Sequence, residues 1–274
     1  MTEPTVEELR DYFSSGRTNA TTNAFLSRFE IIRHAPTEGQ KQRWAPEQES
    51  PQLQRIRRDN LVLPPQTQGM RRNRRRRGPE GPYNIICSTT EIAKNLQELN
   101  PSNNVFVLHP IVGDYAYPEW GEAYDDVGYT TALHNSDKGG DIISALRERF
   151  PEKQFRYSGG VPNKLMKEFY ASLAVLLIPA RTAVYSKTTV EAASAGVPVL
   201  AADLPGIRET GCAAEYLPVD DLDAWVEAIE RYANGDQHLR NTARERYQMN
   251  KERQDQELNE LILVAQTWGI NART

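Results

Sequence analysis

The sequence predicts an α/β fold in which a doubly wound parallel sheet follows an extended, largely irregular N-terminal arm. Two observations support this prediction. From Tyr83 onward, short apolar runs rich in β-branched residues alternate with helical patterns, which is typical of a parallel sheet covered by helices on both faces. Residues 1–82 are instead rich in Gln, Arg, Pro, Asn and Thr and show no sustained apolar period, so we expect an arm there rather than a compact domain.

Composition indicates a soluble protein with enough apolar residues to build a core. The chain has 274 residues, of which 39% are hydrophobic and 26% charged, and this length suits one or two domains. No apolar run approaches the ~20 residues that span a bilayer, and the polar start at Met1 argues against a secretory signal. Cys87 and Cys212 lack metal or redox spacing, so we expect two buried free thiols in a reducing, cytoplasmic compartment.

The arm, residues 1–82, carries a local excess of positive charge that the net charge of -4 conceals. Capping residues and apolar spacing favour short helices over Val6–Phe13 and Thr22–Arg33. The excess comes from a cluster made of Arg71, Arg72, Arg74, Arg75, Arg76 and Arg77. Such a cluster can neutralise phosphates or pair with acidic protein surfaces, so we expect the arm to bind a protein assembly or a nucleic acid, with a solvated linker as the alternative.

The remaining elements follow in strict alternation. We expect strands at Asn84–Cys87, Val105–Leu108, Thr130–Leu133, Gln154–Tyr157, Val175–Ile178, Val197–Ala201 and, at a sheet edge, Glu215–Leu217. We expect helices at Thr90–Leu99, Asp141–Phe150, Lys164–Leu173, Thr188–Ala195 and Asp221–Ala233, and over most of Asp236–Trp268. Gly196 and Pro198 are the stop signals of the helix that precedes them.

A candidate phosphate site lies where the helix expected at Thr188–Ala195 begins. Ligands of α/β sheets bind outside the carboxyl ends of the strands, and helix N-termini there attract phosphate. The residues that open this helix are Ser186, Lys187, Thr188 and Thr189, with Glu191 in its first turn. Hydroxyl groups at such positions cap helices in any protein, and a carboxylate there is favoured by the helix dipole, so purely structural roles remain the alternatives.

Two cations at strand ends are further candidates. Lys138 follows an expected strand and precedes Gly139, so an ammonium group and backbone N–H groups could converge on one anion; the alternative is a solvated loop lysine. Arg181 follows the apolar strand Val175–Ile178, where its guanidinium could grip phosphate through two hydrogen bonds. The alternative for Arg181 is a salt bridge to a nearby acid such as Asp203.

Three of these segments together resemble a known family. Glu191–Val199 is similar to the family's Glu-Ala-Met-Ala-x-Gly-x-Pro-Val, His134–Asp141 to its Lys-Gly segment, and Leu177–Arg181 to its Pro-Ser-Arg segment. They occur in the family's order, and the resemblance covers roughly residues 83–274. The family is that of retaining glycosyltransferases with the GT-B fold, which includes glycogen-synthase-like and sucrose-synthase-like enzymes.

The resemblance implies a domain organisation. Residues 119–274 would be a Rossmann-like nucleotide-sugar-binding domain of the GT-B C-terminal type, ending in helices that cross back to the first domain. Residues 83–118 would be a remnant of the acceptor-side Rossmann domain. Because the family has more strands ahead of that segment than residues 1–82 offer, the N-terminal domain is expected to be truncated or replaced.

The resemblance also implies a function, the transfer of a sugar from a nucleotide-diphosphate sugar to an unknown acceptor. Lys138 would contact the diphosphate, Arg181 and the start of the Glu191 helix would assist, and Glu191 would accept hydrogen bonds from ribose hydroxyls. The donor is a substrate, and neither a cofactor nor a metal site is proposed, because the Asp-x-Asp motif of metal-dependent enzymes has no counterpart in the sequence.

One departure from the family bears on catalysis. The family carries a glutamate near the donor sugar where this chain has Ala183, so no catalytic residue is assigned. Negative charge near a glycosyl transition state is favourable, and an alanine methyl group cannot supply it. The alternative is therefore a catalytically degenerate domain that acts as a structural or interaction protein in a larger assembly, such as a viral particle.

Overall fold

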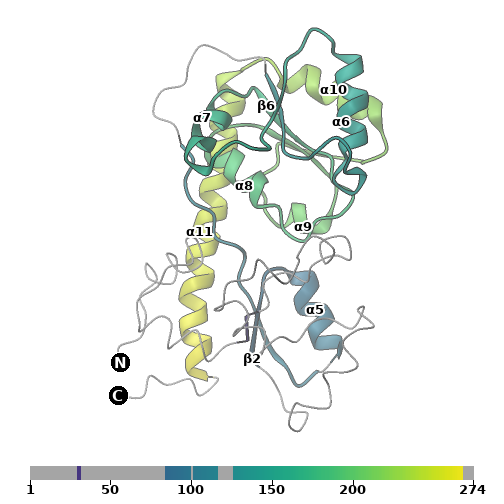
Figure 1. Ribbon diagram of the computed structural model, residues 1–274. Helices are drawn as coiled ribbons and strands as arrows, with labels where there is room; N and C mark the ends of the chain where they lie inside the picture. The colour runs from purple at the N-terminus through teal and green to yellow at the C-terminus, as the bar shows by residue number, and fades with distance from the viewer. Residues whose placement is uncertain (1–29, 32–83, 100, 117–125, 268–274) are drawn as a thin grey trace. The chain divides into compact units, whose positions relative to one another are not determined.

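A computed structural model describes residues 30–31, 84–99, 101–116 and 126–267 of the chain (Figure 1). The arginine cluster, the expected helix at Val6–Phe13 and most of the arm lie outside the described residues. The chain divides into two compact units. One consists of the chain up to His109 together with the chain from Gln256 onward, and the other of Pro110–Asp255.

The first unit contains a small parallel sheet in the order β1-β2-β3. Its strands are β1 (Glu30–Ile31), β2 (Asn84–Cys87) and β3 (Asn104–Val107), and α5 (Thr90–Leu99) connects the last two. Ile85, Cys87, Ala93 and Leu96 form a buried cluster between β2 and α5. The helix expected over Thr22–Arg33 is wrong at residues 30–31, since pairing with β2 overrides the local apolar spacing there.

The second unit is built on a five-stranded sheet in the order β5-β4-β6-β7-β8, and every neighbouring pair is parallel. Its strands are β4 (Val127–Tyr129), β5 (Phe155–Tyr157), β6 (Val175–Ile178), β7 (Val199–Ala202) and β8 (Glu215–Leu217). Its helices are η4 (Ser136–Lys138), α6 (Gly140–Arg149), η5 (Asn163–Leu165), α7 (Met166–Ala171), α8 (Lys187–Ser194), α9 (Pro205–Arg208), α10 (Leu222–Tyr232) and α11 (Gln237–Thr267). This α/β architecture confirms the predicted fold class.

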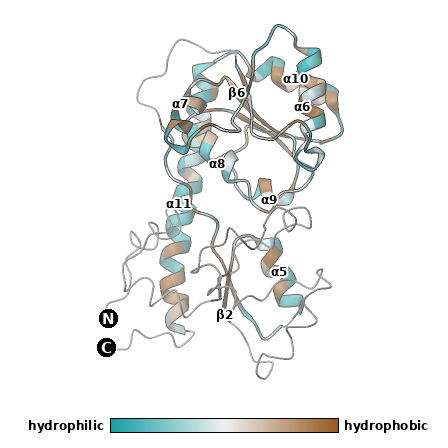
Figure 2. Cartoon of the chain, in the orientation of Figure 1, coloured by the Kyte–Doolittle hydropathy of each residue, from teal (hydrophilic) through white to brown (hydrophobic). Residues whose placement is uncertain are grey.

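The core of the second unit lies along its central strands. Every residue of β6 and β7 is buried, as expected of parallel strands that are covered on both faces. In Figure 1, α6 and α10 lie on one side of β6, and α7 and α8 lie on the other. Figure 2 shows brown apolar bands beside teal polar ones on α6 and α10, which is the pattern of helices that bury one face. Trp225 of α10 is fully buried, and its indole N–H donates to the carbonyl of Pro218 at 2.9 Å.

Most predicted elements are confirmed within a few residues, but the first strand of this sheet was misplaced. The strand expected at Thr130–Leu133 is wrong, because the chain pairs at Val127–Tyr129 instead. Gly128 explains the shift: a Cβ at this position would lie 2.2 Å from a methyl carbon of Leu173. A glycine that lets a neighbouring leucine pack onto the strand is a weak strand signal in sequence, and the β-branched run after it is a stronger one.

Helix α11 contributes residues to both units. In each unit, a side chain of α11 accepts or donates a hydrogen bond at the point where the chain leaves or enters that unit. In the first unit, the backbone N–H of His109 donates to Glu257 at 2.9 Å, and Nδ1 of His109 lies 2.6 Å from the same carboxylate. In the second unit, the amide of Gln254 donates to the carbonyl of Pro110 at 2.9 Å. Within the part of the chain that is described, no helix has both the length and the apolar character needed to cross a membrane.

The loops that follow β4 and β6 are in backbone contact. Gly139 has a φ of 76°, and a Cβ there would lie 1.9 Å from the carbonyl oxygen of Pro179. The backbone N–H of Arg181 donates to the carbonyl of Asp137 at 3.0 Å, which joins the same two loops. In α9, a Cβ at Gly206 would lie 1.7 Å from the carbonyl oxygen of Val184. Glycine therefore permits three loops to meet at the carboxyl edge of the sheet.

This contact generates a stability prediction. We expect Gly139→Ala to lower the free energy of unfolding by about 3 kcal/mol, since it combines a left-handed φ with a clash against fixed backbone. Gly211→Ala is the matched control, because Gly211 has a φ of 65° and open space around its Cβ position. We expect it to cost only about 1 kcal/mol in urea unfolding of the intact chain. Equal losses for the two variants would contradict the close contact of the loops.

Candidate functional site

The strand order of the second unit defines where a ligand is expected. From β4 the chain moves outward to β5 and then returns to add β6, β7 and β8 on the other side, so the order reverses between β4 and β6. Ligands of open α/β sheets bind in the crevice outside the carboxyl ends of the strands at such a reversal. The two loops that leave this point carry Lys138 and Gly139 after β4, and Arg181 and Ser186 after β6.

Lys138 makes a hydrogen bond within the protein. Its side chain is half-buried, and Nζ donates to the carbonyl of Thr182 at 2.5 Å. Burial lowers the pKa of Lys138, and the nearby Asp137 carboxylate opposes that shift. An ammonium group has three donors, so the bond to Thr182 leaves capacity for an anion.

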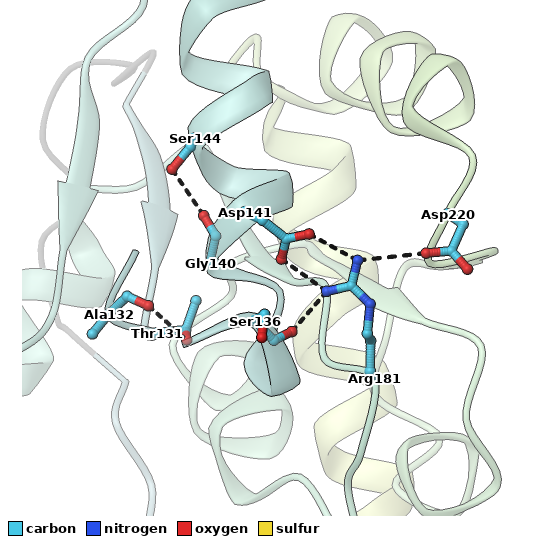
Figure 3. Close-up of polar contacts among 8 residues, drawn as sticks. All are labelled: Thr131, Ala132, Ser136, Gly140, Asp141, Ser144, Arg181 and Asp220. Carbon is cyan, nitrogen blue, oxygen red and sulfur yellow. Dashed lines mark hydrogen bonds and ion pairs between the residues drawn. The ribbon is translucent and has the colours of Figure 1, made fainter. Parts of the chain in front are cut away.

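Arg181 is held by the protein's own carboxylates (Figure 3). Its Nη1 and Nη2 atoms each lie 2.8 Å from an oxygen of Asp141, and Nη1 also donates to the carbonyl of Ser136 at 2.7 Å. Asp220 lies further away, at 3.5 Å. The alternative of an ion pair is thus observed with Asp141; Asp203, the acid named from the sequence, pairs with Arg208 instead.

In the Arg181–Asp141 pair each side chain stabilises the charged form of the other, but both side chains are partly exposed to solvent. The hydrogen bonds from Arg181 lower the pKa of Asp141, and those from Asp141 raise the pKa of Arg181. The two side chains are 34% and 51% exposed, so solvent screening limits the contribution of the pair to stability to about 1 kcal/mol or less. A phosphate that approached Arg181 would therefore need to share the guanidinium with Asp141 or replace it, at a modest cost.

Helix α8 begins with a side-chain cap. Ser186 is its N-cap residue; its Oγ atom accepts from the Thr189 N–H at 3.3 Å and from the Thr189 hydroxyl at 2.7 Å. Thr189 is fully buried, whereas Lys187 is exposed. The capping role expected for this segment is confirmed. The first N–H groups of a helix have no partner within it, so the cap still leaves those of Lys187 and Thr188 at the open end of α8.

Glu191 lies one turn deeper than the sequence suggested. Because α8 begins at Lys187, Glu191 is in its second turn, and the expectation of a first-turn carboxylate is wrong. Helix-dipole stabilisation falls off within the first turn, so it explains little of this residue's placement. Glu191 is half-buried, and its Oε2 atom accepts a hydrogen bond of 2.8 Å from the hydroxyl of Tyr170.

Two tyrosines that the sequence did not single out surround this carboxylate. Tyr170 of α7 is fully buried, and its ring meets that of Tyr115 edge to face with 5.6 Å between centroids. Burial and then the negative charge of Glu191 raise the pKa of both phenols, so both stay protonated at neutral pH. A tyrosine near the end of a short helix does not stand out in the sequence as a site residue, because only the fold brings it close to Glu191.

Ala183 and the turn after β5 make packing and backbone contacts within the second unit. Ala183 packs as a partly buried residue against the core of the second unit. The segment after β5 closes a turn in which the Val161 N–H donates to the Ser158 carbonyl at 3.0 Å. Tyr157, which precedes this turn, is 41% exposed and stacks on Tyr129 with 5.3 Å between ring centroids.

The cysteines and metal-binding groups offer no further site in the ranges described. Cys87 and Cys212 are both buried free thiols, as the sequence predicted. Burial raises the pKa of Cys212 to about 12, which leaves it unreactive as a nucleophile at neutral pH. No group of three or more His, Cys, Asp or Glu side chains that could hold a metal ion occurs among the residues that the structure describes.

Comparison with known proteins matches part of the chain to a family model and to one relative. Residues 137–234 match the family model described as glycosyl transferases group 1. A Klebsiella pneumoniae protein described as an uncharacterized 41.2 kDa protein in the cps region is 25% identical over 132 residues, which cover 47% of this chain and 37% of that protein.

Sucrose-phosphate synthase from Thermosynechococcus elongatus matches with a TM-score of 0.51 and 16% identity, over 69% of this chain and 59% of that one. A mutant of S. aureus TarM in complex with Fondaparinux, alpha-GlcNAc-glycerol and UDP gives a TM-score of 0.49 and 13% identity, over 64% of this chain and 44% of that one. The chain thus spans between 37% and 59% of the length of these three relatives, and the first structure supports the fold alone.

The capping geometry of α8 generates a prediction. We expect Ser186→Ala to lower the free energy of unfolding by about 1 kcal/mol, because it removes the side-chain oxygen that accepts from the N–H and the hydroxyl of Thr189 and leaves that N–H only the Ser186 carbonyl, at 3.2 Å. Ser186→Asp is the matched control, since a carboxylate restores that acceptor and should keep stability near the wild-type value. Urea unfolding of the three proteins measures the difference. An alanine variant as stable as the wild type would show that Ser186 does not cap α8.

Proposed function

We propose that this chain, whose residues 137–234 match the model of group 1 glycosyl transferases, binds a nucleotide-diphosphate sugar and transfers its sugar to an acceptor. The observation that supports the proposal most strongly is a convergence at the sheet's reversal point. The Lys138 loop and the Arg181 loop meet there in backbone contact, and the second of them leads directly into α8.

The diphosphate of the donor fits the start of α8 and the loop at Lys138. The open N–H groups of Lys187 and Thr188 carry the positive end of the helix dipole, which favours an anion. The remaining donors of Lys138 add a full positive charge. Arg181 can bind the diphosphate only if it keeps part of its contact with Asp141 or gives that contact up, so we assign it a secondary part in binding.

In this proposal, Glu191 accepts hydrogen bonds from the ribose of the donor. Its carboxylate is half-buried, and one oxygen is engaged by Tyr170. A carboxylate offers about four lone-pair sites, so the other oxygen can accept from ribose hydroxyls.

Catalysis in this proposal rests on positioning and electrostatics. When the bond between sugar and diphosphate breaks, the leaving diphosphate gains negative charge, which Lys138 and the α8 dipole would stabilise. Retention of configuration is proposed from the family resemblance. No catalytic carboxylate is assigned, since Ala183 occupies the position where the family has a glutamate. The donor is itself the substrate, and neither a metal nor an organic cofactor takes part.

The second candidate function is that of a degenerate glycosyltransferase domain in a larger assembly, and Ala183 is the observation that favours it. It predicts that no sugar nucleotide is hydrolysed or transferred, whether or not a nucleotide binds. The partners of the arm and the cytoplasmic location stay predictions from the sequence.

Donor binding tests the proposal. Titration of the intact chain with UDP, GDP and their sugars should give saturable heat in calorimetry and a rise in melting temperature, because a ligand at 100 times its Kd adds about 2.7 kcal/mol of stability. Lys138→Ala and Glu191→Ala should each weaken binding by about tenfold or more, the value of one charged hydrogen bond.

Lys167→Ala and Glu227→Ala are matched controls, because both side chains are exposed and lie on other helices. They should leave affinity unchanged. The absence of any response to every nucleotide would reject the proposed function. Binding that Lys138→Ala and Glu191→Ala leave intact would reject the site.

A further inference from the structure

We propose that Tyr170 is a positioning residue of the donor site, which fixes the Glu191 carboxylate so that one oxygen faces the ribose hydroxyls. This inference rests on the proposed function. It assigns a role to a residue that contacts no ligand, and it makes selection for ribose depend on a buried tyrosine hydroxyl.

The contact itself has the geometry of a strong, fixed hydrogen bond. The hydroxyl of Tyr170 lies 2.8 Å from Oε2 of Glu191, and Tyr170 is fully buried. The Tyr170 ring is clamped by Tyr115, at 5.6 Å and 88°, and by Phe169, at 5.5 Å and 65°. A ring held by packing on two sides cannot follow the carboxylate if the carboxylate moves, so Tyr170 sets the position of Glu191 rather than the reverse.

The backbone of Glu191 is tied to the same aromatic pair. The backbone N–H of Tyr115 donates to Oγ of Ser194 at 2.9 Å, and that hydroxyl donates to the carbonyl of Glu191 at 2.7 Å. Tyr115 then packs on Tyr170, which holds the carboxylate. Main chain and side chain of Glu191 are therefore fixed by one closed circuit of contacts within the second unit.

Electrostatics favour a permanent donor at this place. Burial, and then the charge of Glu191, raise the pKa of Tyr170, so its hydroxyl carries a proton at any physiological pH. Since Oε2 is engaged by that proton, ribose hydroxyls are directed to Oε1. A glutamate without this bond would sample several rotamers, and each bound ribose would have to order it.

The test compares ribose with deoxyribose. We expect the intact wild-type chain to bind UDP or GDP more tightly than the 2′-deoxy and 3′-deoxy counterparts, and Glu191→Ala to abolish that preference. Tyr170→Phe should raise the Kd of the ribonucleotide about fivefold, because the bound ribose must then order the Glu191 side chain, and change the Kd of the deoxynucleotides less than about twofold. Tyr170→Phe in the Glu191→Ala background should add no further loss of the preference.

Tyr247→Phe is the matched control, because Tyr247 is another buried tyrosine of the same unit and lies on α11. It should leave the ratio of the two Kd values unchanged. A fraction of unfolded protein raises both Kd values equally, so the ratio does not depend on the stability of a variant.

The outcomes separate this inference from the proposed function. If the wild type binds no nucleotide, the proposed function fails and takes this inference with it. If Glu191→Ala abolishes the ribose preference but Tyr170→Phe leaves it intact, or weakens both nucleotides equally, the function stands and the role of Tyr170 is rejected.

A second measurement needs no variant of Tyr170 and covers the case in which Tyr170→Phe does not fold. With the tyrosine Cζ atoms labelled with ¹³C, binding of the ribonucleotide should shift the assigned Tyr170 resonance, because a new donor on Glu191 changes the bond that Tyr170 makes. The deoxynucleotides should shift it less. Equal shifts would reject the positioning role.

Discussion

The backbone contact between the loop after β4 and the loop after β6 is the constraint on which the candidate site depends. At Gly139 the chain passes so close to the Pro179 carbonyl that no side chain fits between them. The second loop leads within a few residues to the N-cap of α8, so the same contact fixes where that helix begins. Cations, open helix N–H groups and one carboxylate of the second unit thereby share an edge of its sheet.

Three side chains of this edge already have hydrogen-bond partners within the protein, and these contacts shape the chemistry that a ligand would meet. Lys138 donates to a backbone carbonyl, Arg181 donates to Asp141, and Glu191 accepts from Tyr170. Fixed groups of this kind are preorganised, because they need little reordering when a charged ligand arrives. These contacts differ in the free energy needed to replace them with contacts to a ligand. The exposed Arg181 pair is weak, whereas the bond from the buried Tyr170 has no solvent to replace it.

Much of this organisation could be predicted from the sequence, and the misses have physical causes. Strand β6 is apolar throughout, so its bounds were predicted without error. Strand β4 was misplaced because Gly128 serves packing by Leu173 and gives no strand signal. The partner of Arg181 was missed since Asp141 lies 40 residues away and only the sheet order brings them together. Tyr170 was missed for the same reason: it lies 21 residues before Glu191, and only the packing of α7 near α8 brings the two side chains together.

The central claim, that the start of α8 and the Lys138 loop form a diphosphate site, is tested most directly by amide hydrogen exchange. Exchange of the intact chain would be compared with and without saturating nucleoside diphosphate, with residue-level resolution. The account predicts slower exchange at Lys187 and Thr188, whose N–H groups lack partners within the helix. Bound nucleotide that leaves these two amides unprotected and slows exchange elsewhere would contradict it.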